Sequence, residues 1–67
     1  MKLYRFITGV DDSEFCHRVT QALNNGWELH GSPCLSFDAV KGQTMCGQAV
    51  VKIKDGDYTR DLKLGEQ

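Results

Sequence analysis

The three cysteines and two histidines of this sequence could act as metal ligands, nucleophiles or bases: Cys16, His17, His30, Cys34 and Cys46. A structural zinc ion takes four Cys or His ligands, commonly from tight pairs such as C-x₂-C, and no such pair occurs here. Cys16 and His17 are adjacent in a predicted helix, where successive side chains diverge by about 100°, so they cannot share a proton. The pattern favours a protein that is not an enzyme, with no catalytic residue, cofactor or metal.

An alternative stays open on the predicted sheet. Cys34 and Cys46 are expected opposite one another on its outer face, and His30 lies four residues before Cys34 on the same strand. These three residues could form a small-ligand or metal-binding site, although the ligand spacing of a structural metal is missing.

Composition places the chain among ordinary globular domains. It has 67 residues and a net charge of −1, without the basic excess that phosphate binding requires, so nucleic acid is not an expected partner. The sequence has no apolar run of membrane-spanning length and no signal-peptide pattern, and three scattered cysteines do not suggest a disulfide framework. We therefore expect a cytoplasmic protein without a membrane partner.

The N-terminal half predicts a strand followed by a helix. Residues 3–8 are rich in aromatic and β-branched residues and end at Gly9, which is typical of a strand. Asp11 as N-cap with Glu14 at the third helical position would form a capping box. The helix then runs to about Asn25, and Gly26 is the expected residue after its end.

Two runs of alternating hydrophobicity follow, at residues 27–37 and 44–53, and predict a hairpin centred near Val40. The expected pairs are Trp27 with Ile53, Leu29 with Val51, Leu35 with Met45 and Glu28 with Lys52. A bulge at Gly31-Ser32-Pro33 could break this register, because proline cannot donate to the ladder.

The order of elements predicts an α+β fold, a two-layer β-α-β-β domain with one helix on a three-stranded antiparallel sheet whose third strand is central. Residues 1–53 form this single domain, and residues 54–67 are expected to be a polar, mobile tail. Because Arg5 should avoid the core, its neighbours Tyr4 and Phe6 are placed inside. The predicted core is Tyr4, Phe6, Phe15, Val19, Leu23, Trp27, Leu29, Leu35, Phe37, Met45, Ala49, Val51 and Ile53.

The other face of the sheet is the predicted surface for self-association. A domain this short buries little surface, so a second subunit would stabilise it. A homodimer or a higher homo-oligomer is therefore the expected partner, although the face could simply be solvated. The predicted interface residues are Leu3, Ile7, His30, Cys34, Cys46, Gln48 and Val50.

The sequence also resembles a family of short bacterial proteins, domain of unknown function 1737. The likeness covers about residues 3–53 and is carried by residues 4–9, 11–12, 15–19, 26–29, 31–33 and 46–50, with Gly26-Trp27 and Gly47-Gln48-Ala49 the more specific segments. Val10 stands where such proteins more often have proline. The resemblance implies a bacterial cytoplasmic protein with no assigned activity.

Overall fold

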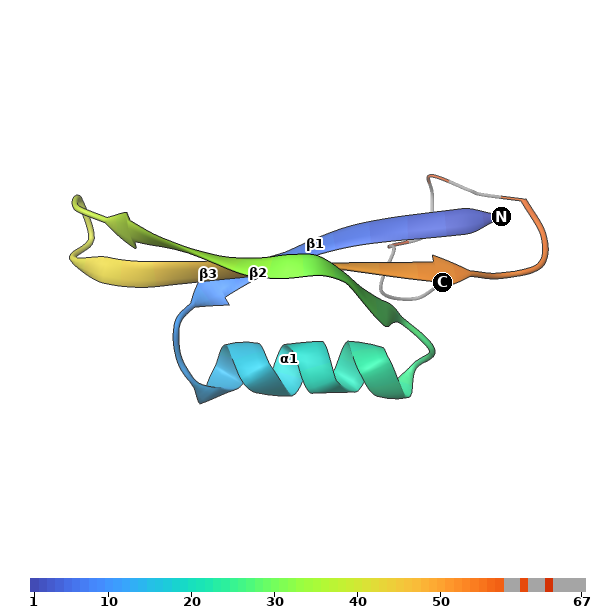
Figure 1. Ribbon diagram of the computed structural model, residues 1–67, viewed down its shortest axis with the longest axis horizontal. Coiled ribbons are helices and arrows are strands. Elements are labelled where there is room, and N and C mark those ends of the chain that lie inside the picture. The colour runs from blue at the N-terminus through green and yellow to red at the C-terminus, as the bar shows by residue number, and fades with distance from the viewer. Residues whose placement is uncertain (58–59, 61–62, 64–67) are drawn as a thin grey trace.

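In the computed structural model the protein is an α+β domain, with one helix on one face of a three-stranded antiparallel sheet (Figure 1). The structure describes residues 1–57, 60 and 63. The elements are β1 (Lys2–Val10), α1 (Ser13–Asn24), β2 (Glu28–Asp38) and β3 (Gln43–Ile53). β3 lies in the centre of the sheet, between β1 and β2, which confirms the predicted fold class and strand order.

The helix begins one residue later than the capping pattern predicted. Asp12 is the N-cap, and its Oδ1 accepts hydrogen bonds from the backbone N–H groups of Glu14, at 3.0 Å, and Phe15, at 3.3 Å. The capping box with Asp11 is therefore wrong. The Asp12 carboxylate instead accepts hydrogen bonds from backbone N–H groups of the first turn, which have no partner within the helix.

The end of the helix agrees with the prediction. Gly26 follows it at φ 93°, in the left-handed region that glycine adopts without strain. The backbone N–H of Trp27 then donates to the carbonyl of Ala22 at 3.1 Å, which turns the chain back over the last helical turn. The Trp27 side chain is consequently buried in the core, 2 % exposed.

The core lies between α1 and one face of the sheet. Its buried members are Leu3, Ile7, Ala22, Trp27 and Val50, with Phe15 and Val19 packed against them. Phe15, Val19 and Trp27 were predicted core residues, and for these the prediction is correct. The strand residues of this core are Leu3, Ile7 and Val50, which the sequence analysis placed on the sheet face away from the helix.

The predicted face is therefore wrong for β1 and β3, whereas β2 turns the predicted residues toward the helix side. Seven predicted core residues expose at least 40 % of their surface. Tyr4, Phe6 and Ile53 lie on the side away from α1, Leu23 lies on α1 itself, and Leu29, Leu35 and Phe37 are on the helix-facing side of β2 but open to solvent. Met45, Ala49 and Val51 are half-buried on the side away from α1.

The wrong face of β1 was chosen because of Arg5: the sequence analysis assumed that a charged residue avoids the helix-facing side. Its guanidinium carbon lies over the Trp27 ring, 5.5 Å from the ring centroid, and Lys52 Nζ lies 5.6 Å from the same centroid. Cations over an indole ring are stabilised by its electron-rich face. Because β1 is an edge strand, the long Arg5 side chain packs its stem on the core and keeps its charge at the boundary.

The register of the β2–β3 hairpin also differs from the prediction. Leu29 faces Val50 rather than Val51, and Leu35 faces Cys46 rather than Met45, so the shift is one residue on each side of the bulge. Glu28 likewise faces Val51 rather than Lys52. The irregularity lies between His30 and Cys34, where the bulge was anticipated. A one-residue shift changes which side chains share a face.

The predicted tail, residues 54–67, lies in large part outside the described residues. Its first residue continues the ladder, because the N–H of Lys54 donates to the carbonyl of Met1 at 2.9 Å. Within the part of the chain that the structure describes, no helix has the length and apolar character needed to cross a membrane.

Candidate interaction surface

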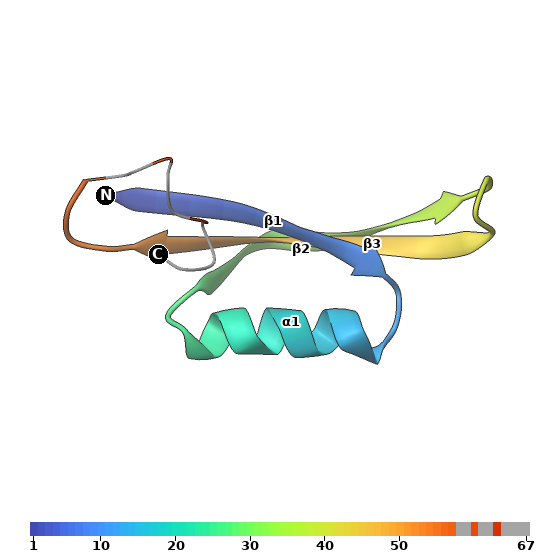
Figure 2. The same cartoon turned by 180° about the vertical axis from the view of Figure 1, so that it is seen from behind.

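The sheet face opposite α1, here called the outer face, carries a continuous apolar surface. Cross-strand neighbours on β1 and β3 form its centre, and we call the following residues the outer patch: Tyr4, Phe6, Met45, Ala49, Val51 and Ile53. Tyr4 is 55 %, Phe6 51 % and Ile53 81 % exposed. Among the described residues no helix or strand covers this face, and two opposite views show α1 on the other side of the sheet (Figures 1 and 2).

The Phe6 ring lies across the sheet because Gly47 leaves room for it. A Cβ atom at Gly47 would lie 2.5 Å from Phe6 Cζ, 2.9 Å from Phe6 Cε2 and 3.3 Å from Cys34 Sγ. Carbon atoms in contact are normally separated by 3.5–4.0 Å, so only glycine permits this position of the ring. Beside the ring, a shallow depression of about 190 Å³ is lined mainly by Phe6, Thr8, Cys34 and Met45.

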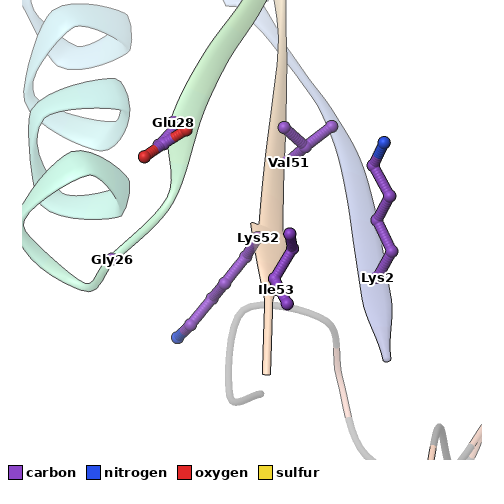
Figure 3. Close-up of a pocket in the computed structure, with 6 residues that line it drawn as sticks. All are labelled: Lys2, Gly26, Glu28, Val51, Lys52 and Ile53. Atoms are coloured by element: carbon purple, nitrogen blue, oxygen red, sulfur yellow. The ribbon is translucent and has the colours of Figure 1, made fainter. Parts of the chain in front are cut away.

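Polar and charged side chains border the outer patch along β2 and at one end of β1. Lys2 lies on β1 and Glu28 on β2, with Val51 and Ile53 of β3 between them (Figure 3). These four residues contribute to the lining of an open depression of about 340 Å³. His30 and Cys34 continue the polar row along β2. An apolar centre with a polar rim is the usual composition of a protein interface.

The predicted interface residues divide between the two faces. His30 and Cys34 lie on the outer face, opposite Ala49 and Gly47. The other five are buried beneath α1 or at the edge of the core: Leu3, Ile7, Cys46, Gln48 and Val50. Their placement on an open surface is wrong. The prediction of which β3 residues face away from the helix depended on the predicted hairpin register, so the error in that register also changed the predicted face.

The two cysteines of the alternative site are separated by the sheet. Cys34 is exposed on the outer face, whereas Cys46 is buried on the helix-facing side, opposite Leu35. Burial and, secondarily, the nearby Asp11 carboxylate raise the pKa of the Cys46 thiol. Among the described residues, no three His, Cys, Asp or Glu side chains are grouped as a metal site would require.

Gln48 has a structural role that the sequence analysis missed. Its Nε2 donates to the carbonyls of Ala49, at 2.9 Å, and His30, at 3.3 Å, and lies 3.5 Å from that of Gly31. The side chain therefore satisfies carbonyls next to the bulge of β2, where the ladder is interrupted. The sequence did contain a signal for this role. Gln48 is a polar residue among apolar neighbours, and it lies opposite the expected bulge.

Two further depressions lie beside α1. One of about 180 Å³ is lined by Arg5, Arg18, Gln21, Ala22 and Asn25. Arg18 Nη1 donates to the carbonyl of Thr8 at 2.8 Å, and Arg5 lies over Trp27, so both cations have structural partners.

The other depression is an apolar groove between α1 and β2. Its volume is about 260 Å³, and its lining residues are Phe15, Cys16, Val19, Thr20, Leu29, Pro33 and Gln48. Leu35 and Phe37 follow on the same face of β2, at the hairpin end of the sheet, and are 66 % and 65 % exposed. This hairpin end projects beyond the helix in both views (Figures 1 and 2).

Together these observations define a small two-layer domain with a covered sheet face and an apolar outer face. The chain belongs to the family described as domain of unknown function (DUF1737), whose sequence model matches residues 1–53. No curated protein and no solved structure shows significant similarity to the chain.

Proposed function

We propose that this protein is a non-enzymatic interaction module that forms homodimers, or higher homo-oligomers, through its outer face. The observation that carries the proposal is the outer patch, in which Tyr4, Phe6 and Ile53 each expose more than half of their surface. Contiguous exposed apolar surface that is rimmed by polar residues is a mark of an interaction site. Aromatic side chains are also enriched in interfaces, because they contribute much contact area.

The size of the face supports a reversible assembly. Strands of 11 residues span about 37 Å, and three strands cover a footprint of about 500 Å². Two such faces bury about 1,000 Å², near the lower limit for specific interfaces. An interface of this size is typical of transient associations, so we expect dimerisation to be reversible. The three cysteines of the described residues are free, in keeping with a bacterial cytoplasmic location, which is part of the proposal.

Sedimentation equilibrium across about 1 µM to 1 mM protein tests the proposal. Wild-type protein should shift from monomer to dimer, and Tyr4→Ser should raise the dissociation constant at least about tenfold, because each dimer loses two aromatic contacts. Leu35→Ser is the matched control. Leu35 is 66 % exposed but lies on the helix-facing side.

The two variants give opposite expectations. A wild-type protein that stays monomeric throughout the series contradicts self-association. A dimer that is weakened by Leu35→Ser and unaffected by Tyr4→Ser places the interface on the helix-facing side and contradicts the assignment to the outer face. Circular dichroism of each variant checks that the fold is retained.

One observation favours a second candidate function, the binding of a small apolar ligand. The depression beside Phe6, Thr8, Cys34 and Met45 opens on the outer face and is lined largely by apolar atoms. Native mass spectrometry of freshly purified protein is the test. An extra mass that is lost on denaturation would support the ligand, whereas a mass equal to that of the chain or its multiple would count against it.

A further inference from the structure

The geometry points to one arrangement of the proposed dimer: two outer faces stack with the two-fold axis parallel to β3, so that β1 of each copy lies over β2 of the other. This inference rests on the proposed function and adds the partner's orientation and the residues that specify it. It follows from how charge is distributed across the three strands.

The outer face consists of rows that run across β1, β3 and β2. One row is Tyr4, Val51 and Glu28, and the next is Phe6, Ala49 and His30. In both of these rows the aromatic ring is on β1, the aliphatic residue is on β3, and the polar residue is on β2. The face is therefore asymmetric from side to side.

Aligned packing of two sheets keeps the strand directions within about 30°, which leaves two choices for the two-fold axis. An axis along β3 exchanges the sides and keeps the rows together. Tyr4 then lies above Glu28 of the second copy, where its hydroxyl can donate to the carboxylate, and Phe6 lies above His30 of the second copy. Each polar rim residue meets a ring from the other copy.

The charged residues Lys2 and Glu28 distinguish a two-fold axis along β3 from one that runs across the strands. Lys2 of β1 lies opposite Ile53, one row beyond the row of Glu28. Figure 3 shows Lys2 and Glu28 on opposite sides of β3. With the axis along β3, Lys2 of one copy comes to lie over the strand that carries Glu28 of the other, about 7 Å along it. The long lysine side chain spans that distance, so the symmetric dimer forms two ion pairs.

An axis across the strands would place β1 over β1 and reverse the rows. With that axis through Ala49, Glu28 would lie over Cys34 and Lys2 over Val10 of the second copy. Each charge would then lose water without gaining an opposite charge, which is unfavourable. Charge complementarity therefore selects the axis parallel to β3.

Charge reversal tests the orientation. Lys2→Glu and Glu28→Lys should each raise the dissociation constant about tenfold, because two attractive contacts become repulsive in the symmetric dimer. The double variant K2E/E28K restores both pairs with reversed signs and should return to within about threefold of the wild type. Lys41→Glu, in the exposed hairpin turn, is the matched control and should leave dimerisation unchanged.

The outcomes separate this inference from the proposed function. A wild-type monomer contradicts both. A wild-type dimer whose affinity is unchanged by the single reversals, or is not restored in the double variant, overturns the orientation and leaves self-association standing. Repeating the series at about 0.5 M salt should reduce the effect of each single reversal, because salt screens rim charges.

Discussion

The two faces of the sheet are both apolar, but only one of them forms the core. On the helix-facing side, Leu3 is 2 % exposed and Val50 is completely buried. On the outer face, Tyr4 is 55 % and Ile53 81 % exposed, although both side chains are at least as large as those of Leu3 and Val50 and Ile53 is equally apolar. Burial is therefore decided by the position of α1 and not by the hydrophobicity of the strands.

The difference between the faces also lies in the kind of side chain. The side under α1 carries aliphatic residues that allow a helix to pack closely, with a single tryptophan that enters from the end of the helix. The outer face carries Tyr4 and Phe6, whose rings are more than half exposed. Large rings on an open sheet face suit contact with a second surface better than contact with a helix.

The largest expected difference between the faces is in stability. Trp27→Ala should lower the free energy of unfolding by about 3–5 kcal/mol, the usual cost of truncating a buried aromatic side chain. Ile53→Ala, on the outer face, should cost less than about 1 kcal/mol under conditions where the protein is monomeric. Urea denaturation followed by circular dichroism measures both values.

The same pair of variants can refute the comparison. Equal costs for Trp27→Ala and Ile53→Ala at low concentration would mean that the two faces are equally buried in the monomer. If the outer face associates, the cost of Ile53→Ala should increase with protein concentration, because folding and dimerisation are then linked. The cost of Trp27→Ala should not show this dependence.

A smaller effect is expected at the glycines of the two faces. Gly47→Ala should destabilise the protein by about 1–3 kcal/mol, because the new Cβ overlaps the Phe6 ring on the outer face. Gly9→Ala is the matched control on the helix-facing side. Its Cβ would lie 3.4 Å from Arg18 Nη1 and 3.6 Å from Phe15 Cδ2, within ordinary contact distances or close to them.

Removing the ring should relieve the overlap. In the double variant F6A/G47A, Gly47→Ala should cost little beyond Phe6→Ala alone, and thermal or urea denaturation of the four proteins in the cycle measures this coupling. Additive costs would show that Phe6 does not occupy the space above Gly47.

Sequence reasoning identified the elements and the strand order because their signals are local. The Gly26 turn and the change to alternating hydrophobicity after Trp27 mark where the helix ends and the sheet resumes. The face that α1 covers has no such signal, because the even and the odd positions of β1 and β3 both include large apolar residues as well as polar ones. Arg5 then decided the choice wrongly, since an edge strand and the Trp27 ring accommodate its charge.

The candidate surface could be predicted only in outline for the same reason. An apolar face without a helix was expected, but five of its seven predicted residues lie on the opposite side of the sheet. The bulge after His30 could be anticipated from Gly31-Ser32-Pro33, whereas the two register shifts that it separates could not. Hydrogen bonds from Gln48 to the carbonyls beside the bulge depend on the folded sheet, so periodicity alone does not reveal them.

The smallest expected effect concerns thiols on the two faces and appears only at high pH. Because burial raises the pKa of Cys46 above its ordinary value of 9.0, the unfolded chain loses this proton more readily than the folded protein. The stabilisation is fully present below about pH 9, the pKa of the unfolded thiol, and is lost as the pH rises through the pKa of the folded state. Urea midpoints between about pH 7 and pH 11 should therefore fall more steeply for the wild type than for Cys46→Ala. Cys34→Ser, on the outer face, is the control and should follow the wild-type profile, since the Cys34 side chain is exposed.

Alkylation with iodoacetamide gives an independent measurement: Cys16 and Cys34 should react first, and Cys46 should react only as the protein opens. Modification of Cys46 as fast as Cys34 would contradict its burial under the helix-facing layer, and with it the assignment of the two faces.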